Sequence, residues 1–207
     1  MQVLITAGAT RNPIDAVRFL SARSSGRTGV ALAGALRAHG ADVTLLGSPE
    51  ACLRAQLADI DAVIEEYGST RDLMGRMEAW VRQHPGGSLV HAAAVGDYEC
   101  AQSAAKIPSG RPTLQLELTP TVKIADAVRG WGLTGRYVTF KAASPETTDD
   151  ALVAIATAQR IRTQCDLVFA NVLGRLDRRL MLVGEGVAHY PRRDEAIAAL
   201  VRFLVMA

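Results

Sequence analysis

The chain has 207 residues, of which 49% are hydrophobic and 21% charged, and its formal net charge is +2. This composition predicts a globular protein with a sizeable core, and the balanced charge excludes an extended nucleic-acid-binding surface. No apolar run reaches the roughly 18 residues that a membrane-spanning helix needs. Three scattered cysteines without metal-ligand spacing suit a reducing compartment. We therefore expect a cytoplasmic protein that binds neither nucleic acid nor a membrane.

The first half of the chain alternates short apolar segments with amphipathic ones. The pattern predicts strands at Gln2–Ala7, Ala41–Leu46 and Ala62–Glu66, and helices at Gly26–Ala38 and Thr70–Gln83. Each strand is mostly apolar and ends near a glycine or a polar turn. This half therefore has the order of a strand–helix–strand protein.

The second half continues the alternation. Strands are expected at Gly87–Val95, Arg136–Ala142 and Asp166–Ala170, and helices at Thr147–Gln164 and Asp194–Met206. Strands that alternate with helices form a parallel sheet covered on both faces. The sequence therefore predicts one Rossmann-like, doubly wound α/β domain spanning residues 1–207.

One segment, residues 98–118, interrupts this alternation. It is polar and rich in Pro and Gly, and then Leu114, Leu116 and Leu118 alternate with polar residues. Such alternation is typical of a half-exposed strand. We interpret this segment, called the arm below, as a flap or a dimerisation arm.

The loop before the first helix contains closely spaced Ser, Gly and Arg residues. Ligands of open α/β sheets bind beyond the carboxyl ends of the strands, and Gly26 and Gly29 allow a phosphate to approach backbone N–H groups there. Ser24 and Ser25 add donors, although serines at this position can also simply cap the helix. The GxGxxG spacing of nicotinamide-binding enzymes is absent, which argues against an oxidoreductase of this fold class.

Three other residues have both a functional and a plain interpretation. His91 lies inside an apolar strand, where a histidine is more often a core residue than a catalyst. Asp97 follows that strand and either binds a sugar hydroxyl or base or belongs to an ordinary turn. Lys106, in the arm, either clamps a phosphate or is solvated. Composition does not choose between these alternatives.

Several stretches together resemble a known family. They read, in order, ITAGATRNPIDAVRFLSARSSGRTG, HAAAVGDY, AKIP, LELTPT, VTFKA and DLVFAN. They are similar to phosphopantothenoylcysteine synthetase over nearly the whole chain, and the first stretch is highly specific. The resemblance implies that a nucleotide, CTP rather than ATP, and Mg²⁺ activate 4′-phosphopantothenate as an acyl-nucleotide, which cysteine then converts to an amide.

The resemblance also implies partners. Family members dimerise through the flap region, so a homodimer is expected. In bacteria the activity is often fused behind a flavin-dependent decarboxylase. Because this chain begins at the first strand of the synthetase, we expect a free-standing or excised synthetase. The resemblance makes a flavin-dependent decarboxylase a candidate partner, and the sequence does not decide whether one is recruited.

Site residues carried over from the family fall into three groups, catalytic, nucleotide-binding and substrate- or phosphate-binding. Lys106 matches a flap lysine that contacts the nucleotide and is implied in forming the acyl-nucleotide, which makes it the catalytic candidate. The nucleotide-binding candidates are Ala92, Ala93, Asp97, Lys106, Pro120, Thr121, Val122, Phe140, Gln159 and Thr163. The candidates for the phosphopantothenate and phosphates are Arg18, Ala22, Ser24, Ser25 and Gly26. No protein metal ligand is implied.

The sequence departs from the family at several of these positions. Ala22 stands where the family has an asparagine that helps to process the acyl intermediate. Pro108 and Ser109 replace two lysines, and Gln159 and Thr163 stand at two further lysine positions. An alternative function is therefore a catalytically impaired homologue that binds a nucleotide or a phosphorylated metabolite as a regulatory or scaffold module.

Overall fold

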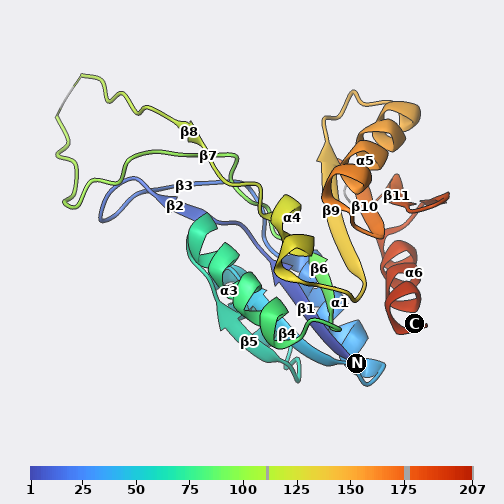
Figure 1. The fold of residues 1–207 in the computed structure, drawn as a ribbon. Helices are drawn as coiled ribbons and strands as arrows, with labels where there is room; N and C mark the ends of the chain where they lie inside the picture. The colour runs from blue at the N-terminus through green and yellow to red at the C-terminus, as the bar shows by residue number, and fades with distance from the viewer. Residues whose placement is uncertain (111, 175–177, 207) are drawn as a thin grey trace.

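A computed structural model describes residues 1–110, 112–174 and 178–206. Its centre is an eight-stranded sheet in the order β12-β11-β10-β9-β6-β1-β4-β5 (Figure 1). Six strands are parallel: β1 (Gln2–Ala7), β4 (Asp42–Gly47), β5 (Val63–Glu66), β6 (Ser88–His91), β9 (Tyr137–Ala143) and β10 (Leu167–Val172). Two more, β11 (Leu180–Val183) and β12 (Val187–Tyr190), continue it antiparallel. The predicted doubly wound α/β fold is confirmed.

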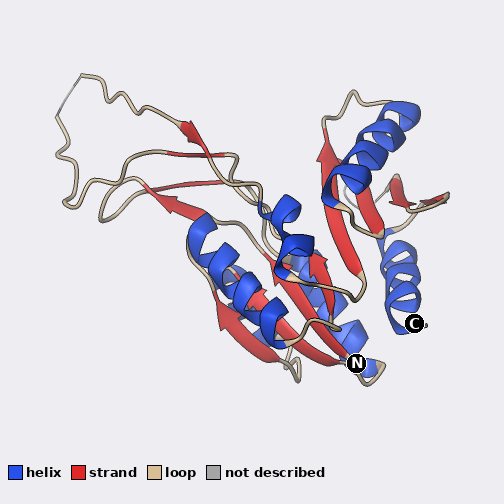
Figure 2. Ribbon diagram, in the orientation of Figure 1, coloured by secondary structure: helices blue, strands red, loops and turns tan. Residues whose placement is uncertain are grey.

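Helices cover both faces of the sheet (Figure 2). One face packs against α1 (Arg27–Ala38), α2 (Pro49–Leu57) and α6 (Arg193–Val205). The other packs against α3 (Thr70–Gln83), α4 (Ile124–Ala127), the short 3-10 helix η1 (Val128–Trp131) and α5 (Asp149–Thr163). Along β1, Val3 and Ile5 enter the first core and Leu4 the second, as the two-residue period of a strand requires.

The α3 helix illustrates how these faces are held. Leu73, Met77 and Val81, spaced four residues apart, are all fully buried against the sheet. Burying each such side chain stabilises the fold by about 1.5–3 kcal/mol. Ser69 caps the helix, since its hydroxyl accepts a hydrogen bond from the Asp72 N–H.

The structure corrects the sequence prediction in three places. β6 ends at His91, because the Ala93 N–H donates to the Thr6 hydroxyl and leaves the ladder; only an isolated bridge from Ala94 to Ala9 follows. The α2 helix and the β11–β12 hairpin were not predicted. The strand expected around Leu114–Leu118 is wrong, because residues 113–118 pair with no strand among the described residues and their leucines lie exposed.

The arm projects beyond the carboxyl end of the sheet beside a hairpin of β2 (Arg11–Pro13) and β3 (Phe19–Ser21) (Figure 1). At its base, β7 (Tyr98–Glu99) pairs with β8 (Thr119–Pro120). The Ser103 N–H donates to the Ile14 carbonyl over 2.9 Å, which ties the arm to the hairpin. The two segments therefore extend together from the body.

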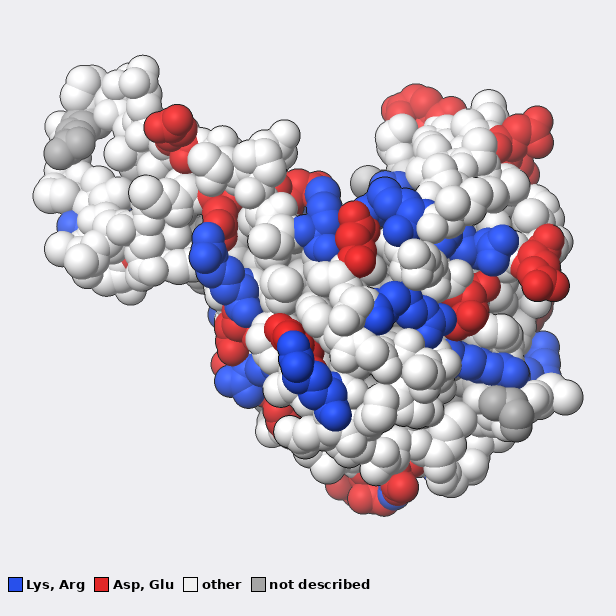
Figure 3. Space-filling view, viewed as in Figure 1, with Lys and Arg blue, Asp and Glu red and all other residues white. Residues whose placement is uncertain are grey.

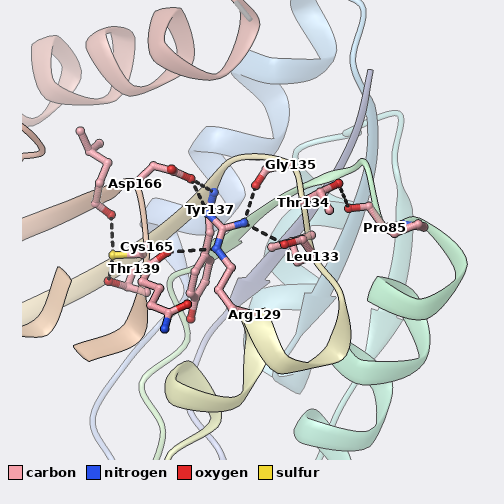
Figure 4. Close-up of polar contacts among 11 residues, drawn as sticks. Pro85, Arg129, Leu133, Thr134, Gly135, Tyr137, Thr139, Cys165 and Asp166 are labelled. Carbon is pink, nitrogen blue, oxygen red and sulfur yellow. Dashed lines mark hydrogen bonds and ion pairs between the residues drawn. The ribbon is translucent and has the colours of Figure 1, made fainter. Parts of the chain in front are cut away.

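At the amino end of the parallel strands, remote from the arm, Arg129 fixes the beginnings of β9 and β10 (Figure 4). Its guanidinium donates to the carbonyls of Leu133, Gly135 and Gln164 and pairs with Asp166 at 2.8 Å. The Asp166 carboxylate in turn accepts the Tyr137 N–H at 2.7 Å. These contacts brace the end of the sheet remote from the arm.

Candidate functional site

The order of the strands locates a crevice between β1 and β6. From β1 the chain builds the sheet outward through β4 and β5, and then returns to add β6 on the other side. Loops at the carboxyl ends diverge at such a reversal, and this is where open α/β sheets bind ligands. The loops after β1 and β6 therefore form the candidate site.

The α1 helix begins in close contact with β1. A Cβ atom on Gly29 would lie 2.6 Å from the Cβ of Ala7, which no side chain tolerates. Gly26, the N-cap residue, has a φ of 71° in the left-handed region, and a Cβ there would lie 2.5 Å from the Cβ of Ala51. These glycines bring the first N–H groups of α1 to the edge of the crevice.

A pocket of about 720 Å³ lies at this helix start, and we call it the anion pocket. Ser24, Ser25, Gly26 and Ala92 line it, so the structure brings together four of the residues predicted from the sequence. Its other lining residues include three arginines, Arg23, Arg27 and Arg193, and no described lining residue is acidic. The positive end of the α1 dipole adds to this charge.

The serines of this loop do not cap α1. Among the described residues, Ser24 Oγ accepts only the N–H of Gly26, over 3.4 Å, and no side chain caps the helix. This finding disfavours the plain capping interpretation. Backbone donors at the helix start therefore face the pocket together with the arginines, an arrangement suited to phosphate groups.

Arg193 is a site residue that the sequence analysis missed. It lies in the first turn of α6, and its guanidinium donates to the Thr28 hydroxyl of α1. This contact holds the guanidinium at the pocket. No local motif marks Arg193; only the packing of α6 against α1 brings it there.

A second space, the small cavity, lies on the other side of the β6 end and measures about 80 Å³. Asp97, Thr121 and Val122 line it, so three more predicted residues come together. The Thr121 hydroxyl donates to the Gly96 carbonyl at 2.6 Å, and Asp97 pairs with Lys123 at 2.5 Å. Asp97 is thus held beside this cavity by an ion pair.

His91 also lines the small cavity and is fixed in one orientation. Its Nδ1 lies 2.8 Å from the Thr6 hydroxyl oxygen, which already accepts the Ala93 N–H. We assign the Thr6 proton to Nδ1, which leaves the ring proton on Nε2. Burial lowers the pKa of His91 to about 4, so the ring is neutral at pH 7. The hydrogen bond from Thr6 to His91 ties β6 to β1.

Phe140, Gln159 and Thr163 make protein contacts near β9 and line neither of these two spaces. Phe140 stacks on Phe169 with ring centroids 4.6 Å apart. The Gln159 amide donates to the Thr139 hydroxyl at 2.9 Å and to the Phe140 carbonyl at 3.1 Å. The buried Thr163 hydroxyl donates to the Gln159 carbonyl. These polar groups support the sheet in this structure.

Arg18 lies between β2 and β3, Lys106 in the arm and Pro120 in β8 at the base of the arm, and none of the three lines the anion pocket. Lys106 is exposed and Pro120 belongs to β8. Arg18 pairs with Asp15 and donates to the Ile107 carbonyl at 3.2 Å. This chain by itself therefore does not bring Lys106 to the phosphate-binding loop.

Asp15, which the sequence analysis did not single out, organises this region. Its buried carboxylate accepts the N–H groups of Val17 and Arg18 at 2.8 Å and of Ile107 at 3.0 Å. Burial raises the pKa of Asp15, but these hydrogen bonds and the Arg18 guanidinium more than offset that effect and hold it well below its usual range.

Ala22 lies beside the anion pocket in a separate side cavity of about 320 Å³. Its small side chain is half-buried.

The described residues contain no group of three or more His, Cys, Asp or Glu side chains placed to hold a metal ion. Within the same described part of the chain, no helix is long and apolar enough to cross a membrane.

Known proteins resemble this chain in sequence and in structure. The family model for the DNA/pantothenate metabolism flavoprotein C-terminal domain matches residues 1–186. The coenzyme A biosynthesis bifunctional protein CoaBC of Thermococcus kodakarensis is 34% identical over 194 residues, which cover 90% of this chain and 46% of the relative. CoaBC of Mycobacterium tuberculosis is 36% identical over 183 residues, covering 84% and 42%. The chain thus spans less than half the length of these relatives.

A crystal structure of the DNA/pantothenate metabolism flavoprotein from Streptococcus pneumoniae matches with a TM-score of 0.85 at 26% identity, covering 98% of this chain and 97% of that one.

Proposed function

The chain belongs to the DNA/pantothenate metabolism flavoprotein C-terminal domain family, and from this we propose that it acts as a phosphopantothenate–cysteine ligase in coenzyme A biosynthesis. The observation that carries the proposal is the anion pocket: three arginines and an uncapped helix start meet at the β1–β6 crevice without an acidic side chain in the described lining. The reaction handles a triphosphate and a phosphorylated acid, so it needs such a pocket.

The reaction has two steps. A carboxylate oxygen of 4′-phosphopantothenate attacks the α-phosphorus of CTP; the new O–P bond forms as the α–β bridging bond breaks and pyrophosphate leaves. The amine of cysteine then attacks the acyl carbon, a C–N bond forms, the C–O bond to the nucleotide breaks, and CMP leaves while the ammonium protons pass to solvent. The protein contributes positioning and charge neutralisation.

Two sets of described residues are suited to bind the two ends of a nucleotide, the phosphate groups and the nucleoside. Arg23, Arg27 and Arg193, with the backbone of Ser24–Gly26, are suited to bind phosphate groups in the anion pocket. Asp97 and Thr121, beside the small cavity, are suited to the sugar and base. We propose CTP rather than ATP as the nucleotide.

Mg²⁺ enters this proposal with the nucleotide as part of the substrate. The lining of the anion pocket offers it no carboxylate among the described residues, and Mg²⁺ in such sites keeps waters and binds substrate phosphates. Its chemistry is to share the charge of the triphosphate. No protein ligand for it is proposed.

A homodimer formed through the arm and hairpin is the proposed assembly. Exposed apolar side chains gather there: Val17, Phe19, Tyr98, Leu114, Leu116 and Leu118. Figure 3 shows that the projecting part carries few charged side chains on that face. Such a surface suits a protein partner. In a dimer, Lys106 of one copy could serve the anion pocket of the other.

A flavin-dependent decarboxylase is proposed as a further partner, because the matched CoaBC relatives are bifunctional.

The alternative is a homologue that binds a nucleotide or a phosphorylated metabolite without this catalysis. Two observations favour it: Ala22 offers no side-chain donor, and the polar groups of Gln159 and Thr163 bond within the protein. Such a module would still use the anion pocket.

Incubation with 4′-phosphopantothenate, cysteine, Mg²⁺ and either CTP or ATP tests both functions. We expect pyrophosphate release with CTP and a product with the mass of phosphopantothenoylcysteine. Nucleotide binding by calorimetry without pyrophosphate release would instead support the binding module. Light scattering tests the dimer, and a monomer at micromolar concentration would contradict it.

A further inference from the structure

The side cavity adjoins the anion pocket and shares part of its wall. Arg23, Ser24 and Ser25 line both spaces. The rest of the lining of the side cavity differs in character: Ala9, Phe19 and Ala22 are apolar, Ser21 is polar, and Arg11 and Glu50 carry opposite charges. A molecule in this cavity therefore lies directly beside whatever occupies the anion pocket.

Arg11 and Glu50 form an ion pair that is held from several sides. The Arg11 guanidinium lies over the Phe19 ring, 4.8 Å from its centroid. The Ser48 hydroxyl donates to the second Glu50 oxygen at 2.9 Å. Burial raises the pKa of Glu50, but its own N–H, the Ser48 hydroxyl and Arg11 together lower it below its ordinary value. The Glu50 carboxylate is therefore charged at neutral pH.

The pair leaves donor and acceptor capacity open. The Arg11 side chain is 30% exposed and that of Glu50 is 55% exposed. A guanidinium presents five N–H donors, of which this pair uses one, and a carboxylate accepts more than two hydrogen bonds. The negative group of a small zwitterion can thus bind Arg11 while its positive group binds Glu50.

We propose that the side cavity is the subsite for the α-amino acid substrate. Arg11 binds the α-carboxylate, Glu50 binds the α-ammonium group, and the short thiol side chain lies against Ala9, Phe19 and Ala22. The inference rests on the proposed ligase function and names the residues that recognise its second substrate. The shared wall of Arg23 to Ser25 places the amine beside an acyl-nucleotide held in the anion pocket.

Steady-state kinetics with cysteine varied test this subsite. Arg11→Gln and Glu50→Gln should each raise KM for cysteine about ten- to a hundredfold, the loss expected for one charge-assisted hydrogen bond. KM for CTP should change far less. Arg82→Gln and Glu78→Gln, which break an ion pair on the surface of α3, are the matched controls. Equal KM values for cysteine in wild type and both subsite variants would overturn the proposal.

Two further measurements separate recognition from folding. Cysteamine lacks the α-carboxylate, so Arg11→Gln should reduce the preference of the enzyme for cysteine over cysteamine by about tenfold or more. The double variant Arg11→Glu with Glu50→Arg keeps an ion pair but reverses its polarity. The reversal loses the Ser48–Glu50 hydrogen bond and the Arg11–Phe19 contact, so the melting temperature should fall while the protein still folds, and cysteine use should be lost. Full cysteine use by a folded double variant would contradict the subsite.

A wild type that releases no pyrophosphate would refute the ligase function itself. Saturation-transfer NMR with L-cysteine alone still tests the subsite in that case. We expect transfer to the ligand in wild type and in Arg82→Gln, and its loss in Arg11→Gln and Glu50→Gln. Transfer that is absent from wild type, or that persists in both subsite variants, would refute the proposed subsite.

Discussion

The backbone N–H of Ile107 donates a 3.0 Å hydrogen bond to the carboxylate of Asp15, 92 residues earlier in the chain. Ile107 follows Lys106 directly, and Arg18 contacts both Asp15 and the Ile107 carbonyl. The arm segment that carries the catalytic candidate is therefore anchored to the β2–β3 hairpin by one buried carboxylate.

Asp15→Asn should destabilise the fold at neutral pH. The folded-state pKa of Asp15 is lowered, so its stabilising contribution is present above its unfolded pKa of about 3.9 and is lost as the pH falls toward the folded value. The difference in melting temperature between wild type and variant should be largest near pH 7 and shrink below pH 4. Thermal melts over this range measure it, and a constant difference would contradict the role of the charge.

Arg27→Gln should weaken anion binding without harming the fold. A positive charge in the first turn opposes the helix dipole by about 0.3–1 kcal/mol, so its removal leaves the melting temperature unchanged or raises it. Affinity for CTP and for pyrophosphate should fall about tenfold, as expected for one lost charged contact. Calorimetry measures the affinity of Arg27→Gln for both ligands, and Arg202→Gln, a change at an exposed residue of α6, is the control. Equal affinity in both variants would remove Arg27 from the pocket.

Lys106→Ala should weaken nucleotide binding or abolish pyrophosphate release and leave the melting temperature unchanged, because the side chain is exposed. The expectation rests on its position in the arm and its match to the family's flap lysine. Gln102→Ala, also exposed on the arm, is the control. Unchanged CTP affinity and turnover in Lys106→Ala would exclude Lys106 from the site.

Asp97→Ala should act on the nucleoside end of the substrate. Asp97 lies beside the small cavity and outside the anion pocket, so its loss should change the discrimination between CTP and ATP more than the affinity for free pyrophosphate. Competition assays with the three compounds measure this. Equal losses of affinity for CTP and pyrophosphate would show that Asp97 does not recognise the nucleoside.

Ala22→Asn should raise product formation about ten- to a hundredfold if wild type is a slow ligase. A new hydrogen bond to a charged group contributes roughly 1.5–3 kcal/mol, which speeds the reaction by that factor when it forms only in the transition state. Single-turnover product formation in both proteins is the measurement. A fast wild type that asparagine fails to improve would show that Arg23 or another group already fills this role, and an inactive pair would support the binding module.

Local pattern was sufficient for the body of the fold. β1 and α3 were predicted with their observed bounds, because a buried strand and an amphipathic helix each have a strong period of their own. The α2 helix was missed, since its buried residues are only Ala51, Cys52 and Ala55, although Ser48 and Pro49 form a helix-start signal. Leu114–Leu118 had the alternation of a strand but pairs with no strand in the part of the chain that the structure describes.

The candidate site was only partly predictable for a different reason. Ser24–Gly26 lie in the connection from β1 to α1 and Asp97 lies in the loop after β6, so the topology rule alone places them at the crevice. Arg193 reaches the anion pocket from a helix at the far end of the chain, through the packing of α6 against α1. Asp15 acts through backbone N–H groups of a distant segment. Neither contact leaves a signal in a short stretch of sequence.

The position of β1 in the middle of the sheet bears on how the chain folds during synthesis. β4 and β5 extend the sheet on one side of β1, and β6, β9, β10, β11 and β12 follow on the other in the order in which they leave the ribosome. No strand of this sheet has to be inserted between two that are already paired, so the nascent chain can add each one at an open edge. The exposed stage comes after β6, whose outer edge stays unpaired while the whole arm is being synthesised. An unpaired edge is where nascent chains associate wrongly. Synthesis of the arm therefore lengthens the time during which the edge of β6 is open to wrong association.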